Sequence, residues 1–262
     1  MSSLARPELP PLGSAEAFER ARGCAERARA APVSFFASDG AAERLAARRA
    51  ALQLGVFCGT GGGARGARAG SVTCVALGDE GPPPERAARV ALAGALFFGD
   101  DRPFRLVLAL QARPKTLAHD RPLTRADVNS GVTYPAERLV LLWRADPDFW
   151  KVLLHEVGHL CGGQADEAAT EARALDMNCA LRARTYPEYQ ALRADQLSRS
   201  RALAGRVARA DVGETNASLY WQRGPCLLAG GAPEACARPF ACRPDGGPDE
   251  VFTVTDGRPI AL

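Results

Sequence analysis

Helical and extended hydrophobic patterns alternate along the 262 residues. Ala and Leu at helical spacing predict helices over residues 14–30, 41–54, 85–96, 148–161, 166–184 and 189–210, with Ser14 as the first N-cap. Apolar runs predict strands over residues 56–58, 71–77, 104–111, 128–133 and 138–144. Gly and Pro mark residues 59–70, 113–125 and the tail after 213 as loops. This order predicts an α+β fold with a small mixed sheet and a helical lobe that follows it.

The predicted helix 148–161 has two unlike faces. His155 and His159 are four residues apart, so they share one face of the helix. The apolar side chains fall on nearly the opposite arc, and they are Trp150, Leu153, Val157 and Leu160. We therefore expect the helix to bury one face and to point both imidazoles away from it.

Residues 155–159 read His-Glu-Val-Gly-His, which is the HExxH arrangement of zinc peptidases. Two neutral imidazoles at this spacing can bind one Zn²⁺. Glu156 lies on the flank of the imidazole face, where its carboxylate can act as a general base without being a ligand. The chain has three histidines, so a chance match to this motif is rare. The alternative is a pair of histidines on a helix surface.

A zinc site of this type needs a third protein ligand. His119 lies in a loop flanked by prolines and is a poor candidate, and the longer motif HExxHxxGxxH fails because its last position is Ala165. Asp166 is a weak fallback. Glu167 and Glu171 share a face of the following helix, and helical geometry does not separate them.

The motifs around this helix resemble those of a group of zincin metallopeptidases from large DNA viruses and some protists. The matching residues are Val128-Asn129-Ser130-Gly131, Thr133, Arg144, Trp150-Lys151-Val152, His155–His159, Thr170-Glu171, Asn178, Asn216-Ala217-Ser218 and Tyr220-Trp221. The resemblance covers roughly residues 113–225. The chain departs from the pattern at Trp221, where the group has Tyr. It also departs at Leu175, where gluzincins often carry Asp.

The resemblance implies a zincin-like fold, with an edge strand just before the HExxH helix, and a polypeptide substrate. It favours Glu171 as the third ligand, so that Zn²⁺ is held by His155, His159 and Glu171 and activates a water for Glu156. Tyr220 is either a donor to the developing oxyanion or a side chain that simply packs. The alternative to an enzyme is a non-catalytic structural or virion protein stapled by a metal.

Three divisions of the chain follow from this interpretation: an N-terminal helical extension (1–30), a zincin-like metallopeptidase domain (31–225) and a loop-rich, Cys-containing tail (226–262). The formal net charge of +3 is too small to indicate a nucleic-acid partner. No run of 18 apolar residues predicts a membrane span. No signal peptide is evident, so we expect the cytoplasm or nucleus, or the virion for a viral source, and mostly reduced cysteines.

Overall fold

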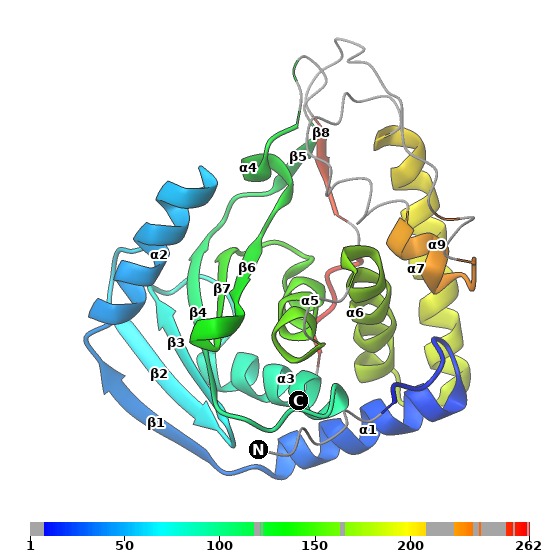
Figure 1. Cartoon of the computed structure of the whole chain (residues 1–262), viewed down its shortest axis with the longest axis horizontal. Helices are drawn as coiled ribbons and strands as arrows, with labels where there is room; N and C mark the ends of the chain where they lie inside the picture. The colour runs from blue at the N-terminus through cyan, green and yellow to red at the C-terminus, as the bar shows by residue number, and fades with distance from the viewer. Residues whose placement is uncertain are drawn as a thin grey trace.

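A computed structural model describes residues 8–117, 121, 123–162, 166–207, 223–232, 236, 250–253, 255–260 and 262. It has a mixed α+β architecture around an open six-stranded mixed sheet, as the sequence pattern predicts (Figure 1). In spatial order the strands are β1 (Val33–Ser38), β2 (Ala64–Ala69), β3 (Val72–Leu77), β4 (Phe104–Gln111), β7 (Leu139–Arg144) and β6 (Gly131–Tyr134).

Strands β3, β4 and β7 run parallel to one another, whereas β2 and β6 run antiparallel to their neighbours in this central group. The outermost strands are β1 and β6. A separate two-stranded sheet joins β5 (Lys115–Leu117) to β8 (Glu250–Phe252) from the far end of the chain.

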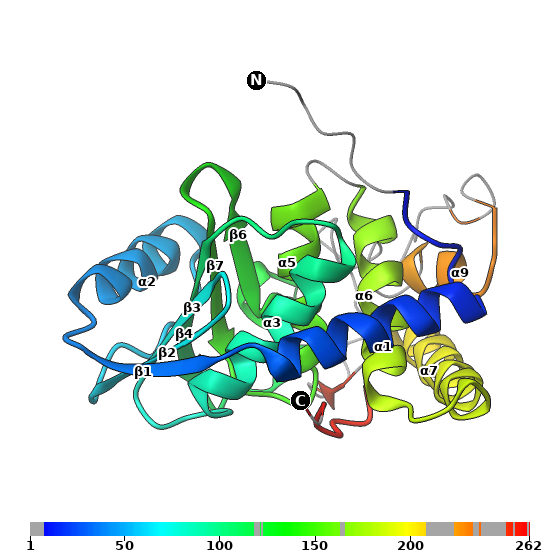
Figure 2. The same ribbon diagram turned by 90° about the horizontal axis from the view of Figure 1, so that it is seen from below.

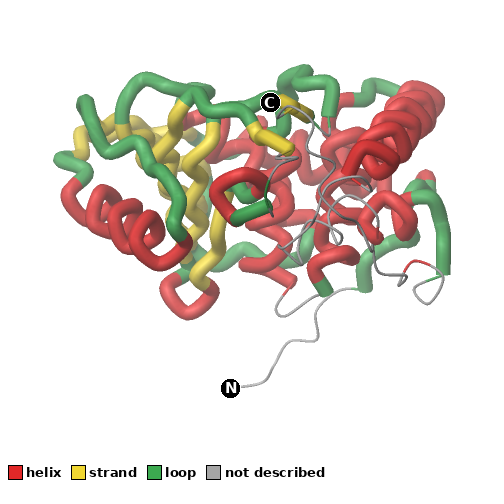
Figure 3. The backbone as a smooth tube through the Cα atoms, turned by 90° about the horizontal axis from the view of Figure 1, so that it is seen from above, coloured by secondary structure: helices red, strands yellow, loops and turns green. Residues whose placement is uncertain are grey.

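Helices cover both faces of the sheet, and a helical half extends from one side of it (Figures 2 and 3). Helix α2 (Ala41–Leu54) covers one face, while α3 (Pro84–Phe97) and α5 (Phe149–Gly162) cover the other. Helix α6 (Glu167–Arg182) packs on α5, and α7 (Tyr186–Val207) follows it. Helix α1 (Ala15–Ala30) crosses α3 and α6. Short elements are α4 (Arg125–Val128), the 3-10 turn η1 (Pro135–Glu137) and α9 (Gly224–Leu228).

Both faces of the central strands are buried, which explains their continuous apolar runs. Along β4 and β7, Val107 and Leu141 face the α2 side, whereas Leu106 and Leu142 face the side of α3 and α5. Alternate residues therefore supply two hydrophobic cores. The site-bearing helix α5 belongs to the second core.

Two segments differ from the predicted elements in the first half of the chain. Residues 56–58 were predicted as a strand but form a loop, and residues 59–70 were predicted as a loop but contain β2. Strand β2 is stabilised by pairing with β1 and β3, which local composition does not reveal. Gly66 also lets the ring of Phe36 lie on the strand, since a Cβ there would be 2.3 Å from Phe36 Cε2.

Differences near the candidate site matter more for function. Residues 128–133 were predicted as one strand, but the segment divides into the end of α4 and the start of β6. The predicted strand that runs into the HExxH helix is β7, and it is internal rather than an edge, with all six residues buried. The edge strand beside α5 is β6.

The first described residues hold α6 and α7 together. The carbonyl of Gly13 accepts hydrogen bonds from Tyr186 Oη (3.1 Å) and Gln190 Nε2 (2.7 Å), both on α7. Arg173 Nη1 on α6 donates to the carbonyl of Pro10 (2.6 Å). Helix α1 then buries Phe18 in the same core as α3 and α5, so residues predicted as an extension contribute to the main core.

None of the described helices is long and apolar enough to cross a membrane.

Candidate metal centre

Helix α5 carries the HExxH residues through the middle of the molecule. We predicted one buried face, but 12 of its 14 residues are buried because α3, α6, β6 and β7 surround it. Gly158 permits the close approach of α6, since a Cβ there would lie 3.0 Å from Thr170 Cγ2. His155 is 4% exposed, and the His159 side chain keeps 18% exposure. His155 is therefore buried, whereas His159 on the same helix is partly open to solvent.

Three donor atoms converge beside α5. The Nε2 atoms of His155 and His159 are 2.9 Å apart. Glu167 Oε2, at the start of α6, lies 3.2 Å from His155 Nε2 and 3.1 Å from His159 Nε2. Among the described residues, these three form the cluster of donors that could hold a metal ion.

The triangle of donors fits a zinc ion. Tetrahedral Zn²⁺ with ligands at about 2.0–2.1 Å separates those ligands by about 3.3 Å. Two imidazoles and one carboxylate are also the donor set of catalytic zinc sites with three protein ligands, which leave a fourth position for water or substrate. The site residues therefore match zinc in both spacing and chemistry.

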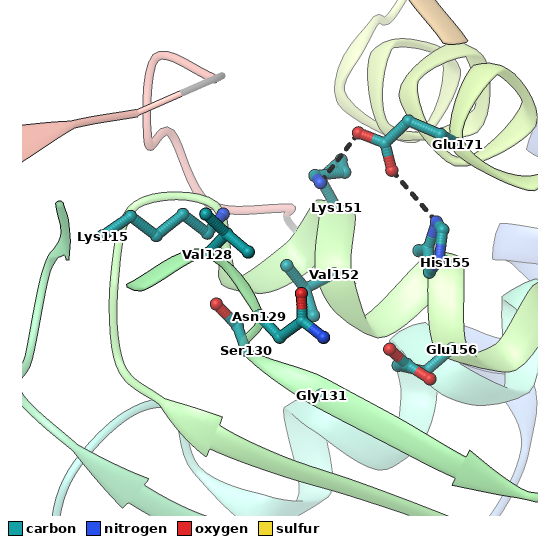
Figure 4. Close-up of a pocket in the computed structure, with 10 residues that line it drawn as sticks. All are labelled: Lys115, Val128, Asn129, Ser130, Gly131, Lys151, Val152, His155, Glu156 and Glu171. Carbon is teal, nitrogen blue, oxygen red and sulfur yellow. Dashed lines mark hydrogen bonds and ion pairs between the residues drawn. The ribbon is translucent and has the colours of Figure 1, made fainter. Parts of the chain in front are cut away.

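Glu171, which the family resemblance favours as a ligand, lies elsewhere. Its Oε2 is 3.0 Å from His155 Nδ1, and its Oε1 accepts a hydrogen bond from Lys151 Nζ at 2.8 Å (Figure 4). Nδ1 and Nε2 are on opposite sides of an imidazole, so Glu171 contacts His155 on the side away from the three donors. The structure brings Glu167, not Glu171, to both Nε2 atoms.

Two carboxylates dominate the electrostatics around the histidines. Burial alone would lower the pKa of His155, but Glu167 and Glu171 outweigh it and raise that pKa to about 9. Burial would raise the pKa of Glu167, but His155 and His159 hold it well below its usual range. Likewise burial opposes ionisation of Glu171, whereas Lys151 and His155 lower its pKa to about 2. Both carboxylates are therefore ionised around the histidines.

Glu156 lies against strand β6. Its Oε2 lies 2.7 Å from Thr133 Oγ1, which donates to it, and the same hydroxyl is 2.8 Å from the Glu156 carbonyl. Gly131 leaves room for this carboxylate, because a Cβ there would lie 2.8 Å from Glu156 Cγ. The Asn-Ser-Gly and Thr matches thus lie directly against Glu156.

Four residues weighed in the sequence interpretation lie outside the described part of the chain. They are His119, Ala165, Tyr220 and Trp221, of which Tyr220 was the candidate oxyanion donor. Asp166 directly precedes α6 and lies 3.8 Å from Arg223 through Oδ2 and Nη2. It is not one of the three converging donors.

A buried ionic network, which was not predicted from the sequence, lies next to the site. Lys115 Nζ donates to Asp148 Oδ2 at 2.6 Å, and both side chains are almost fully buried. Asp148 Oδ1 accepts from the backbone N–H of Thr255 at 2.8 Å, so the network fastens the end of the chain to the start of α5. The signal in the sequence that could have indicated this network is Lys151, because it lies one turn before His155 in an otherwise apolar stretch.

In comparisons with known proteins, no protein-family model, no curated protein and no solved structure matches the chain.

Proposed function

We propose that this chain is a zincin-like, zinc-dependent hydrolase, and specifically a peptidase. The observation that carries the proposal is the convergence of His155 Nε2, His159 Nε2 and Glu167 Oε2 within 3.2 Å of one another. In this assignment Glu167 is the third zinc ligand. Glu171 positions His155 through Nδ1, as outer carboxylates commonly do at metal-bound imidazoles.

When held by His155, His159 and Glu167, Zn²⁺ would supply a Lewis acid and would lower the pKa of a water at the site. Glu156 takes the proton from the attacking water and passes it to the leaving amine. Thr133 holds Oε2 of that carboxylate, which fixes its orientation. Lys151 neutralises Glu171, so that the buried carboxylate remains ionised behind His155.

Strand β6 supports a polypeptide as the substrate. It pairs with β7 on one side and, within the described part of the chain, with no strand on the other. An edge strand of this kind can accept an extended peptide through backbone hydrogen bonds. Glu156 contacts this same strand, so a peptide bound along β6 would pass beside the proposed base.

The test combines metal content with activity. We expect about one zinc per chain by elemental analysis after purification in zinc-replete medium. Glu156→Gln should retain that zinc and lose peptidase activity by roughly a hundredfold or more, which is the scale of general-base catalysis. Glu19→Gln, an exposed change on α1, serves as the matched control.

Two outcomes would reject the proposal. A wild-type protein without bound transition metal would remove the zinc site. A zinc-loaded protein that cleaves nothing in a broad peptide library would favour the non-catalytic, metal-stapled alternative.

A further inference from the structure

Strand β1 forms one edge of the main sheet, and within the described part of the chain no strand pairs with its outer side (Figure 1). Residues 34–37 of this strand are exposed, and Phe35 keeps 70% of its surface in solvent. An edge strand presents a row of unpaired N–H and C=O groups, which is a template for another strand. The aromatic ring of Phe35 adds an apolar contact to that template.

The pairing of β2 shows which backbone groups of β1 point outward. The N–H of Gly78 donates to the carbonyl of Gly63 at 2.8 Å, and the antiparallel register continues without a shift along β2 and β3. Since bonding alternates along an antiparallel strand, the odd-numbered residues of β2 bond to β3 and its even-numbered residues bond to β1. The even-numbered residues of β1 lie opposite the latter. The residues of β1 whose N–H and C=O groups point outward are therefore Val33, Phe35 and Ala37.

Strand β1 lacks the features that usually keep an edge unpaired. It has no charged side chain and no proline, and its register with β2 is continuous over all six residues, so it has no bulge. Pro32 and Asp39 directly flank the strand and confine any further pairing to residues 33–38. An incoming strand therefore meets six uncharged residues.

This segment is complementary to itself. With a two-fold axis at Phe35, antiparallel pairing of two copies places Val33 opposite Ala37 of the second copy and brings the two Phe35 side chains together on one face. Every outward backbone group of Val33, Phe35 and Ala37 then has a partner, and no like charges lie opposite each other. Because both copies use the same surface, the contact closes at two molecules. Pairing of β1 with the four-residue edge strand β6 of another molecule would leave two residues of β1 unpaired and would not close.

We propose that this chain forms a symmetric dimer in which β1 pairs antiparallel with β1 of a second copy, so that the two six-stranded sheets become one. The proposal does not depend on the zinc site, because β1 and β6 lie at opposite edges of the sheet. A six-residue edge is small for an interface, so we expect a reversible dimer with a dissociation constant in the micromolar range.

Sedimentation of the full chain over a range of micromolar concentrations tests the proposal. Wild type should shift from monomer to dimer as its concentration rises. Phe35→Lys places two ammonium groups opposite each other and should raise the dissociation constant about tenfold or more. The matched control is Leu52→Lys on α2, where the leucine is 86% exposed, and it should leave the dissociation constant unchanged.

A second variant tests the backbone bonds directly. Ala37→Pro removes an N–H that points away from β2, so the β1–β2 ladder stays intact while the dimer weakens about tenfold or more. Amide exchange measured by NMR gives a further check on wild type. Exchange at Phe35 and Ala37 should slow as concentration rises, whereas Phe36, which bonds to β2, should exchange slowly at every concentration.

Three results would overturn the proposal. The first is a wild-type protein that stays monomeric at every concentration, which would leave the edge unpaired or open to a different strand. The second is a dimer that neither Phe35→Lys nor Ala37→Pro weakens, or that Leu52→Lys weakens equally, since its interface would lie elsewhere. The third is open-ended assembly beyond two copies, which would indicate pairing of unlike edges.

Discussion

Glu167 and Glu171 stand one turn apart on α6 and contact opposite sides of the same imidazole. Glu167 Oε2 faces Nε2 of both histidines, whereas Glu171 Oε2 faces Nδ1 of His155. The helical wheel correctly placed both residues on the face toward α5. What it could not supply is the rotation of the His155 ring, which decides which carboxylate meets Nε2.

Zinc titration separates the two roles at the residue scale. Glu167→Ala should weaken zinc binding more than a hundredfold, because the proposed direct ligand is lost. Glu171→Gln should weaken it about 10–100-fold, the usual range for outer-shell partners. Competition with a chelating indicator measures both constants. If Glu171→Gln loses more zinc affinity than Glu167→Ala, the ligand is Glu171.

Thr133 tests whether the orientation of Glu156 matters. Thr133→Val removes the hydroxyl that donates to Glu156 Oε2 and preserves the side-chain shape. We expect kcat to fall roughly tenfold while zinc content stays the same, because one hydrogen bond to a charged group is lost. Thr73→Val on β3, whose hydroxyl accepts from Arg68, is the matched control. If kcat is unchanged in Thr133→Val, the Thr133 hydroxyl does not contribute to catalysis.

At the element scale, the contact between helices α5 and α6 sets the triangle of three donor atoms, because two donors come from α5 and the third from α6. Gly158 is the point of closest approach, where an added Cβ would meet Thr170 Cγ2 at 3.0 Å and Phe98 Cζ at 3.3 Å. The Thr170-Glu171 match to the zincin group is therefore also explained by the packing of Thr170 on Gly158.

Gly158→Ala should separate the helices slightly. We expect the free energy of unfolding to fall by about 1–3 kcal/mol, the usual cost of overpacking, and zinc affinity to fall with it. Chemical denaturation and zinc titration measure the two effects. Gly23→Ala on α1 is the control, because nothing lies within 4 Å of that Cβ, and it should stabilise the protein by about 0.5–1 kcal/mol. If Gly158→Ala and Gly23→Ala change the free energy of unfolding equally, close packing at Gly158 is not needed for stability.

Elements with strong local signals were predictable from the sequence. Ser14 caps α1 as predicted, α2 and β4 have the predicted bounds, and the long helices differ only at their ends. Strands β1, β2, β5 and β8 were missed, and each is held by a partner elsewhere in the chain. Pairing across a sheet depends on tertiary structure, which local periodicity does not encode.

The residues of the candidate site also divide into those predictable from local sequence and those that depend on tertiary packing. The HExxH spacing placed His155 and His159 on one face because four residues make about one helical turn. The partners of Lys151 and Lys115 were not predictable, since Glu171 and Asp148 meet these lysines only after the elements pack. A lysine within a buried helix was the one available hint of that network.

At the scale of the whole molecule, the cysteines fall into two groups. Five described cysteines form no disulfide in the described part of the chain, and they are Cys24, Cys58, Cys74, Cys161 and Cys179. Cys226 and Cys236 form a disulfide, which the sequence analysis did not predict. Cys226 lies in α9, the helix that packs on α6, and the bond joins it to Cys236, 10 positions later in the chain.

Removing the disulfide should destabilise the protein. We expect the Cys226→Ser, Cys236→Ser double variant to lose about 2–3 kcal/mol of unfolding free energy, mainly because the unfolded chain regains loop entropy. Denaturant titration measures this, and Cys58→Ser is the control because Cys58 is a half-buried free thiol. If the double variant and the wild type unfold at the same denaturant concentration, the bond does not stabilise the fold.

The attachment of Pro10–Gly13 to α6 and α7 has a consequence for biosynthesis. Gly13 contacts Tyr186 and Gln190, which follow it by 173 and 177 positions in the chain. Thr255 contacts Asp148, which precedes it by 107 positions. At roughly 5–20 residues per second, the ribosome needs on the order of ten seconds or more to supply such partners. The two histidines, by contrast, come together as soon as one turn of helix forms. We therefore expect the nascent chain to offer a weak two-histidine site first, and the proposed zinc site to bind tightly only after Thr255 has been synthesised.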